Sequence, residues 1–534
     1  MLIGYVSDEY YVAIPSAPYV IKTSDGEFIS GTSNATGEIH AEIDAGEIEI
    51  TVNPRGFGPK RVVARFEAIN PIQLRLLSET LYGFVWPKWV NEGGSAEVLI
   101  SSKTPYRAEL WRYGKQKQKV SNLGFDSHPL GATMQPLDDG DFVGEGVHWR
   151  DGIKFKAPED SGLYMVHIWN LSGETLAIPL IVSPSKPKKE IAVLTSSITW
   201  NAYNNFGGRS NYVLASGLPS RPLLSRRADL PRYQEDFTGE HDSWSAMEYP
   251  AISFKRPEPA NQIPLQEEIE DDISTRDACG LASAEWRTIG WLEEKKLNFD
   301  LYSEVQLHSE EIDLEKYRVL VLNCHPEYWS RKMFETVKKW VYEKGGRLIY
   351  LGGNGINCEV DLTSTGAMTV KNGDYSQYFE NGNFRCFCEM PCGQDYQSRF
   401  TTSASPESEL LGISYTRSGL MTGAPYQVIS ADHWIFEGTN LKNGDIFGVI
   451  SSHTRCPGGA SGHELDKRDK FSPKNLEVLA KGKNPDDSGA EMITFTTNSN
   501  GMVFSVGSIS YPCSLNVDPG ISKVTENVFR RFLA

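Results

Sequence analysis

A strand–helix–strand unit in the second half of the chain is the feature that most constrains the fold. The short apolar run Val319–Leu322 ends in a polar tip, and a helix-like segment, Met333–Lys344, follows it. Gly345-Gly346 then leads into a second apolar run, Arg347–Leu351. Two apolar runs joined through a helix are typical of neighbouring strands in a parallel sheet. The pattern therefore predicts a βαβ unit within an α/β domain.

Polar residues gather where the two apolar runs end. His325 and Glu327 follow the first run with Pro326 between them, and Asn354 lies in a glycine-rich segment after the second. Ligands of parallel sheets bind beyond the carboxyl ends of the strands, so these side chains are candidates for a site. Each residue also has a purely structural explanation. His325 could be a loop histidine whose ring nitrogens are hydrogen-bonded, Glu327 could cap the next helix, and Asn354 could occupy a left-handed turn.

The first third of the chain has a different pattern. A length of 534 residues exceeds what one hydrophobic core supports, so several domains are expected. Short alternating runs such as Glu47–Val52 and Gly162–Trp169 are separated by Gly, Asn and Pro. They predict a small β module at residues 1–73 and an immunoglobulin-like β-sandwich at residues 74–183.

An α/β domain is expected at residues 190–534, after the polar linker Ser183–Lys189. Its first strand is predicted at Ile191–Leu194, a continuous apolar run typical of a buried parallel strand. Further strands are predicted at Asn298–Tyr302, Asp445–Ile450 and Met502–Val506, helices at Trp286–Lys296 and Ser522–Leu533, and a long irregular insertion at about 357–440. We expect a mainly parallel sheet that resembles the class I glutamine amidotransferase-like or flavodoxin-like fold.

The net charge and the cysteines indicate which binding partners and which cellular compartment to expect. The net charge of −16, without a basic stripe, argues against nucleic acid or an anionic membrane as partner. No apolar run reaches the length of a membrane span, and no signal peptide is recognised. Eight irregularly spaced cysteines indicate reduced thiols and a cytoplasmic protein. The tight group Cys386, Cys388 and Cys392 fits no common zinc pattern, which favours a structural role over a metal cluster.

Two tyrosines follow the first strand of the predicted α/β domain. Tyr203 and Tyr212 flank Gly207-Gly208, and the first strand should end at the same sheet edge as Glu327. Two phenols and a carboxylate are then within reach of one another. Phenolate and carboxylate oxygens are hard, anionic donors that suit a highly charged ion such as ferric iron. The alternative is that both tyrosines pack in a lid over the sheet.

A third loop, Pro457–Lys467, carries an acidic group after a run of glycines. The glycines can bring Glu464 close to a bound ligand. The alternative is an exposed charged turn in which Asp466 pairs with Lys467 or Arg468, an interaction that contributes little on a surface.

A thiol nucleophile is a further hypothesis. The chain lacks the Gly-x-Ser-x-Gly elbow of serine hydrolases. Cys324 ends a predicted strand and resembles the nucleophile of the glutamine amidotransferases, which also follows a strand. His325 is nevertheless adjacent in sequence and therefore poorly placed to activate the thiol.

Taken together, these segments resemble the large (β) subunit of N,N-dimethylformamidase and its wider family. The matching segments are Asn201–Asn204, Gly207–Tyr212, Ser253–Pro257, Tyr317–Leu322, His325–Tyr328, Gly345–Gly355 and Gly462–Asp466. The similarity covers about residues 190–534 and leaves the first 180 residues unmatched.

The resemblance implies hydrolysis of a small amide to an acid and an amine at a mononuclear ferric iron. Two tyrosinates and one glutamate hold the iron in that family. Tyr203 and Glu327 match two of these ligands. Tyr212 is the expected second tyrosine, with Tyr249 as the alternative.

The resemblance also implies the catalytic groups and the partners. Asn354 and Glu464 match the asparagine and the second glutamate near the iron, and His325 matches the neighbouring histidine. We expect Glu464 to act as general base, and Asn354 and His325 to bind the oxyanion or orient the water. A small amide substrate, a homo-oligomer and a small partner subunit are expected. The alternative to an enzyme is a non-catalytic protein that binds a ligand or a partner and whose catalytic site has degenerated.

Overall fold

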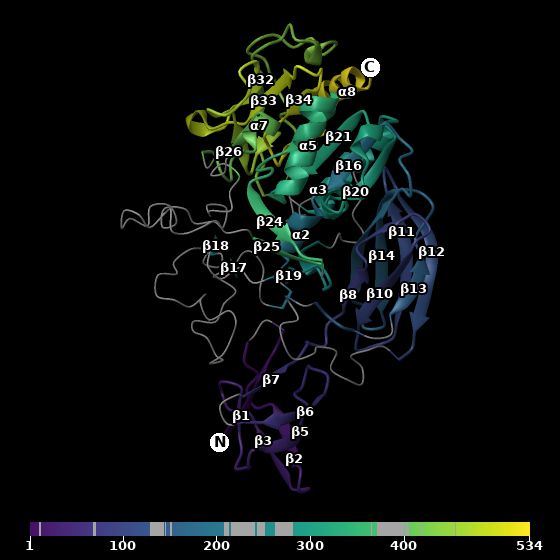
Figure 1. Ribbon diagram of the computed structural model, residues 1–534, viewed down its shortest axis with the longest axis vertical. Coiled ribbons are helices and arrows are strands. Elements are labelled where there is room, and N and C mark those ends of the chain that lie inside the picture. Colours follow the sequence, from purple (N-terminus) through teal and green to yellow (C-terminus); the bar gives the residue numbers. More distant parts are fainter. Residues whose placement is uncertain are drawn as a thin grey trace, which may run out of the picture.

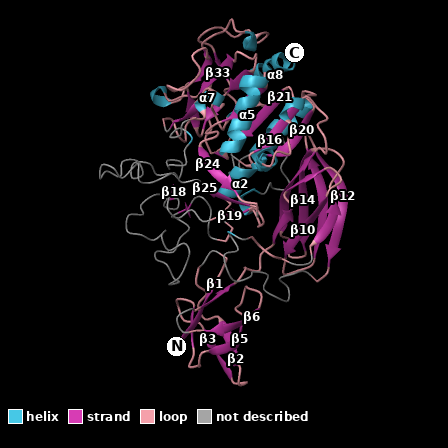
Figure 2. Cartoon of the chain, viewed as in Figure 1, coloured by secondary structure: helices cyan, strands magenta, loops and turns pink. Residues whose placement is uncertain are grey.

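The computed structural model describes most of the chain. The described residues are 1–9, 12–67, 71–128, 144, 146–149, 152–204, 206–207, 213–214, 241–242, 251–261, 281–364, 366–370, 400, 405–416, 418–453 and 455–534. The chain is mostly β, with few helices, and its two termini lie at opposite ends of the molecule (Figures 1 and 2).

The first strands form a small β module. They are β1 (Leu2–Ser7), β2 (Pro18–Thr23), β3 (Phe28–Thr32), β4 (Glu38–His40), β5 (Gly46–Val52), β6 (Lys60–Phe66) and β7 (Ile72–Arg75). Two sheets result, in the orders β4–β1–β7 and β3–β2–β5–β6. The alternation in β5 buries Ile48, Ile50 and Val52 in the module's core. Because apolar residues two apart share one face of a strand, the sequence pattern predicted this face correctly.

Eight strands form the second β module. They are β8 (Tyr82–Trp86), β9 (Trp89–Asn91), β10 (Ser95–Ser101), β11 (Tyr106–Tyr113), β12 (Lys117–Asp126), β13 (Ile153–Lys156), β14 (Gly162–Asn170) and β15 (Thr175–Ser183). They make two sheets, β13–β10–β8 and β12–β11–β14–β15–β9, which share a core. The prediction of amino-terminal β modules is thus confirmed, whereas the domain limits stay predictions.

The second module also packs on the rest of the chain. Leu163 and Met165 of β14 join a core cluster with Trp286 and Leu301 from the carboxyl-terminal part. The opposite face of β14 lines the sandwich core through Tyr164 and other residues. Gly162–Trp169 therefore lacks the solvent-exposed face that an alternating sandwich strand usually has, because both of its faces are covered.

A nine-stranded sheet dominates the carboxyl-terminal part. Its order is β20 (Phe299–Ser303), β16 (Ile191–Thr195), β21 (Val319–Cys324), β23 (Arg347–Gly352), β34 (Met502–Ser505), β33 (Glu491–Thr496), β32 (Glu477–Gly482), β28 (Tyr426–Val428) and β29 (Ile446–Phe447). Neighbours from β20 to β34 pair in parallel, and the pairs from β34 to β29 are antiparallel. The sheet is therefore mixed, and the expectation of a mainly parallel sheet holds only for its first half.

The parallel half places the ends of three strands together. Across the sheet, its strands are β20, β16, β21, β23 and β34, so the second strand in the sequence lies at the edge, beside the first. This 2-1-3-4-5 order is found in open doubly wound sheets. Such sheets bind ligands where the order reverses, here between β16 and β21. The closer resemblance to the class I glutamine amidotransferase-like fold is not shown and stays a prediction.

Helices cover both faces of this sheet. They are α2 (Ser197–Tyr203), α3 (Ala282–Glu294), α4 (Glu304–His308), α5 (Arg331–Lys344), α7 (Ser408–Leu411) and α8 (Pro519–Leu533), with short 3₁₀ turns at Pro259–Asn261, Leu314–Lys316, Trp434–Phe436, Pro485–Asp487 and Tyr511–Ser514. Within the described part of the chain, none of the helices has the length and apolar character needed to cross a membrane.

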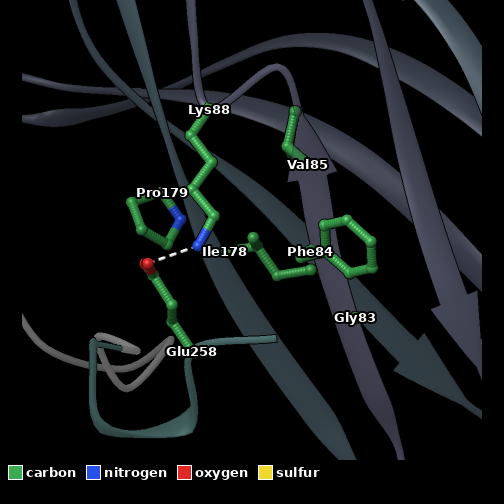
Figure 3. A pocket seen from close by; sticks show the side chains of 7 residues that line it. All are labelled: Gly83, Phe84, Val85, Lys88, Ile178, Pro179 and Glu258. Atoms are coloured by element: carbon green, nitrogen blue, oxygen red, sulfur yellow. Dashed lines mark ion pairs between the residues drawn. The ribbon is translucent and has the colours of Figure 1, made fainter. Parts of the chain in front are cut away.

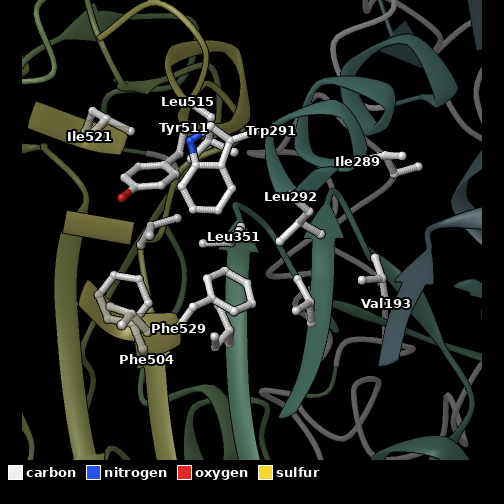
Figure 4. Packing of buried hydrophobic residues seen from close by; sticks show 14 of the residues in the cluster. Val193, Ile289, Trp291, Leu292, Leu351, Phe504, Tyr511, Leu515, Ile521 and Phe529 are labelled. Carbon is white, nitrogen blue, oxygen red and sulfur yellow. The ribbon is translucent and has the colours of Figure 1, made fainter. Parts of the chain in front are cut away.

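Strand residues alternate between the two helical layers. Leu320 and Leu348 pack with residues of α5 on one side of the sheet. Val321 and Leu351 pack on the other side with α3 and α8, where Trp291 and Phe529 lie 5.9 Å apart between ring centroids (Figure 4). Burial on both faces explains why these strands read as continuous apolar runs.

Two sequence expectations need correction. The predicted strand Asp445–Ile450 shrinks to β29, because Gly448 adopts a φ of 69° and the chain turns away. β29 is the antiparallel edge of the sheet, so the Pro457–Lys467 loop does not follow a parallel strand.

The predicted insertion at 357–440 is not wholly irregular. It contains β24 (Cys358–Leu362), β25 (Ala367–Val370), α7, β26 (Ser414–Thr416), β27 (Gly423–Ala424) and β28. A small sheet, β19–β25–β24–β22, joins two of these strands to β19 (Ile252–Ser253) and β22 (Tyr328–Trp329). Two-stranded pairs β26–β31 (Leu465–Lys467), β27–β30 (Ser461–Gly462) and β17 (Val213–Leu214)–β18 (His241–Asp242) complete the sheets of the described residues. Cys386, Cys388 and Cys392 lie outside the described residues.

A buried ion pair joins the second β module to the segment after β19. Lys88 and Glu258 pair in a small pocket lined by Gly83, Phe84, Val85, Ile178 and Pro179 (Figure 3). Their side chains are 10% and 5% exposed. Burial lowers the pKa of Lys88 to about 8, even though the charge of Glu258 opposes this shift.

We predict that Lys88→Met destabilises the protein by about 3 kcal/mol, because Glu258 keeps a buried charge without its partner. The double variant Lys88→Met/Glu258→Gln removes both charges and should recover most of this loss. Urea unfolding of the three proteins measures the difference. Equal destabilisation by the single and double variants would contradict the account.

Candidate functional site

The candidate site lies at the carboxyl ends of the parallel strands. Tyr203 comes from α2, which follows β16, and His325 and Glu327 come from the loop after β21. Asn354 lies in the loop after β23, and Glu464 lies between β30 and β31. The structure brings these five predicted side chains together from four separate segments.

Three of the five side chains form a closed triangle of contacts. Tyr203 Oη lies 2.9 Å from Glu327 Oε2 and 3.1 Å from His325 Nε2. The His325 Nε2 to Glu327 Oε2 distance is 3.1 Å. Glu327 is fully buried, and His325 is only 2% exposed. The hypothesis that Tyr203 merely covers the sheet is incomplete, because its hydroxyl bonds directly to the carboxylate.

His325 is held in one orientation. Its Nδ1 donates to the Gly353 carbonyl at 2.9 Å, so Nε2 faces Glu327 and Glu464, the latter at 3.7 Å. Burial lowers the pKa of His325, but the hydrogen bond and charge of Glu327 and the charge of Glu464 outweigh it. Together they raise the pKa of His325 to about 9. The imidazole is therefore a proton-bearing group between two carboxylates.

Asn354 links the glycine-rich loop to Glu464. Its Nδ2 donates to Glu464 Oε2 at 2.7 Å, and its backbone N–H donates to Asp466 Oδ1 at 2.8 Å. Asp466 also accepts a hydrogen bond from Tyr350 Oη at 2.9 Å. The backbone of Asn354 is left-handed, with a φ of 49°, which agrees with the structural explanation proposed for this residue from the sequence. No donor among the described residues reaches the buried Asn354 Oδ1.

The acidic loop is buried, which rules out the alternative of an exposed turn. Glu464 and Asp466 are 7% and 1% exposed. Burial raises the pKa of Asp466 to about 7, against the hydrogen bonds from Asn354 and Tyr350. A surface pair of Asp466 with a neighbouring lysine or arginine is therefore not its main interaction.

Two glycines allow the loops to meet. A Cβ on Gly352 would lie 2.1 Å from the carbonyl oxygen of Cys324, and one on Gly353 would lie 2.5 Å from that of Glu464. Any side chain at these positions would push the loops apart. The glycines of this segment thus allow its backbone to lie directly against the backbones of Cys324 and Glu464.

Cys324 is poorly suited to act as a nucleophile. Its thiol is fully buried and packs with Ala284 and Ile509. Its backbone is left-handed, with a φ of 58°, which is a feature of nucleophile elbows. Access to substrate, which a nucleophile requires, is lacking.

Sequence reasoning missed two buried glutamates behind the site. Glu285 Oε1 accepts hydrogen bonds from Ser196 N at 3.0 Å and Trp200 Nε1 at 2.8 Å. Glu304 Oε1 accepts one from Trp329 Nε1 at 2.7 Å. Burial raises the pKa of Glu285 to about 8 and that of Glu304 well above its usual range. Each glutamate lies near the start of a helix, where an acidic residue is common, so the sequence carried no signal.

The described donors fit a hard cation in part. Tyr203 and Glu327 offer a phenol and a carboxylate oxygen 2.9 Å apart, the donor types that ferric iron prefers. Tyr212 and Tyr249, the candidates for a second tyrosine, lie outside the described residues. Among the described residues, no group of three or more His, Cys, Asp and Glu is suited to hold a metal ion.

Comparison with known families gives one extensive match. A profile described as "N,N-dimethylformamidase beta subunit-like, C-terminal" matches residues 106–526. The match starts at β11, well before residue 190, where the motif resemblance begins. No curated protein matches the sequence.

Comparison with solved structures adds no argument. The major pilin subunit BcpA of Bacillus cereus matches at 11% identity, over 36% of this chain and 71% of that chain, with a TM-score of 0.13. A DUF3823 family protein from Parabacteroides merdae matches at 11% identity, over 33% and 88%, also with a TM-score of 0.13. TM-scores this low do not establish a shared fold.

We predict that Glu285 makes the protein less stable as pH rises. A folded-state pKa of about 8, above the ordinary 4.5, means that the folded protein binds more protons in this interval. The free energy of unfolding should therefore fall by roughly 1.4 kcal/mol per pH unit in wild type relative to Glu285→Gln. Denaturant unfolding between pH 5 and 9 measures both proteins. Parallel pH profiles would show that Glu285 is already ionised.

Proposed function

The chain belongs to the N,N-dimethylformamidase beta subunit-like family, and on this premise we propose that it is an iron-dependent hydrolase of a small linear amide. The family suggests a hydrolase and implies amidohydrolase activity in general. The observation that carries the finer proposal is the contact between Tyr203 and Glu327, inside a buried site that also contains His325, Asn354 and Glu464. Hydrolysis of a C–N bond needs the groups that this site gathers.

Tyr203 and Glu327 would hold the ferric ion, together with a second tyrosine from the segment after α2. When bound, the ion would act as a Lewis acid that polarises the amide carbonyl and makes water more acidic. Burial of Glu327 and Glu464 supports this assignment, because grouped carboxylates in a dry site favour a cation.

Glu464 is the proposed general base. It takes a proton from the attacking water as the C–O bond forms, and returns this proton to the nitrogen as the C–N bond breaks. Asn354 Nδ2 orients the carboxylate of Glu464 through their 2.7 Å hydrogen bond. His325, whose Nδ1 is fixed on the Gly353 carbonyl, would donate a hydrogen bond from Nε2 to the developing oxyanion.

We propose a small amide substrate because the site residues are almost completely buried. We also propose a cytoplasmic protein, on the irregular spacing of the eight cysteines in the sequence. Homo-oligomerisation and a small partner subunit remain part of the proposal. Light scattering of the purified chain, alone and from native extract, tests both.

Purified protein should contain about one iron ion per chain and show a visible phenolate-to-iron absorption band. Tyr203→Phe should weaken and shift this band, because it removes one of the two phenolate ligands. Elemental analysis and absorption spectroscopy measure these properties. A colourless protein that binds no added ferric iron and hydrolyses no amide would sink the proposal.

Glu464→Gln should retain iron and lose at least about a hundredfold in kcat, because an amide cannot accept the proton of water. Glu92→Gln is the matched control, since Glu92 is a buried carboxylate that pairs with Lys188 far from the site. Assays against a panel of small amides compare the two variants. Full activity of Glu464→Gln would refute the assignment of the base.

A further inference from the structure

Two matching segments of the sequence contain residues to which the proposed chemistry assigns no role. They are Asn201–Asn204, in which only Tyr203 has a role, and Ser253–Pro257, which lies about fifty residues later. The structure packs them against each other. At their centre is Arg256, a fully buried arginine outside the triangle of Tyr203, His325 and Glu327.

Arg256 donates to backbone carbonyls where α2 ends. Its Nη2 donates to the carbonyls of Asn201 at 3.2 Å and Asn204 at 2.9 Å, and its Nη1 donates to that of Phe206 at 2.7 Å. Its Nε donates to the Ser253 carbonyl at 3.0 Å. Carbonyls in the last turn of a helix lack partners within the helix, and a cation there also complements the helix dipole. Arg256 supplies donors to the Asn204 and Phe206 carbonyls just beyond the helix, and adds one to the Asn201 carbonyl, which also accepts the Asn204 N–H.

Two asparagines fasten the same segments from the other side. Asn201 Nδ2 donates to the Ile252 carbonyl at 3.0 Å, and Asn204 Nδ2 donates to the Pro257 carbonyl at 2.7 Å. Tyr203 lies between these asparagines in sequence. The backbone on both sides of the tyrosine is thus bonded to the segment that carries Arg256.

The opposite end of α2 meets two buried carboxyl groups. Glu285 and Glu304 accept hydrogen bonds from the backbone N–H groups of Ser196 and Ile198, whereas the Ser196 side chain makes no capping bond. A helix of seven residues is marginal on its own. Buried side chains therefore hold both of its ends.

We infer that Arg256 is a positioning residue for Tyr203: its guanidinium fixes the end of α2 so that the phenol meets Glu327 and His325. This inference rests on the proposed function in assigning a metal-binding role to Tyr203. The buried pair of Glu258 with Lys88 continues the connection from Arg256 to the second β module. Lysine cannot replace Arg256, because one ammonium group does not span carbonyls on both sides of the planar guanidinium.

The first test uses the metal-free full-length protein. Hydrogen exchange of peptides spanning residues 196–206 should be about tenfold faster in Arg256→Ala than in wild type. Arg256→Lys keeps the charge and should exchange nearly as fast as the alanine variant. Arg287→Ala is the matched control, since Arg287 is a buried arginine that bonds Ser283 and Ser452. Unchanged exchange in a folded Arg256→Lys protein would overturn the inference.

The second test measures ferric binding by the same variants. The ferric dissociation constant should rise at least about tenfold in both Arg256 variants and stay unchanged in Arg287→Ala. Methylguanidinium should partly restore the visible band of Arg256→Ala, which general unfolding would not allow. Faster exchange with unaltered ferric affinity would overturn the positioning role. If wild type binds no ferric iron, the proposed function fails, and hydrogen exchange alone decides whether Arg256 holds α2.

Discussion

The parallel pairing of β16, β21 and β23 is the constraint on which the site depends. It brings the carboxyl ends of three strands to one edge, so that α2 and two loops meet there. Gly352 and Gly353 then allow contacts between backbones that any side chain would prevent. Glu464 enters this edge from between β30 and β31, which belong to two separate two-stranded pairs.

Several buried acidic side chains determine the electrostatics of this sheet edge. Glu327, Glu464 and Asp466 are each less than a tenth exposed, and Glu285 and Glu304 are fully buried behind them. Several ionised carboxylates cannot share a dry site without compensation. Burial raises the pKa of the two rear glutamates, which disfavours their charged forms, and the neighbouring carboxylates raise the pKa of His325 in front of them. A cation beside Tyr203 and Glu327 would complete this compensation.

Sequence patterns predicted the parts of the fold that depend on periodicity. The runs at Val319–Leu322 and Arg347–Leu351 became β21 and β23, and α5 lies between them as expected. Asp445–Ile450 failed because a left-handed Gly448 turns the chain, which an apolar run does not reveal. Glu285 and Arg256 escaped notice for a related reason. Most of their partners are backbone or side-chain atoms on other segments of the chain, and such contacts leave no trace in a sequence.

The central claim is that Tyr203 and Glu327 share one metal ion. Anomalous diffraction at the iron absorption edge, from crystals of the iron-loaded protein, tests it most directly. The account predicts a single strong peak within bonding distance of Tyr203 Oη and a Glu327 carboxylate oxygen. A peak bound elsewhere on the chain, or no peak in a protein that hydrolyses amides, would contradict it.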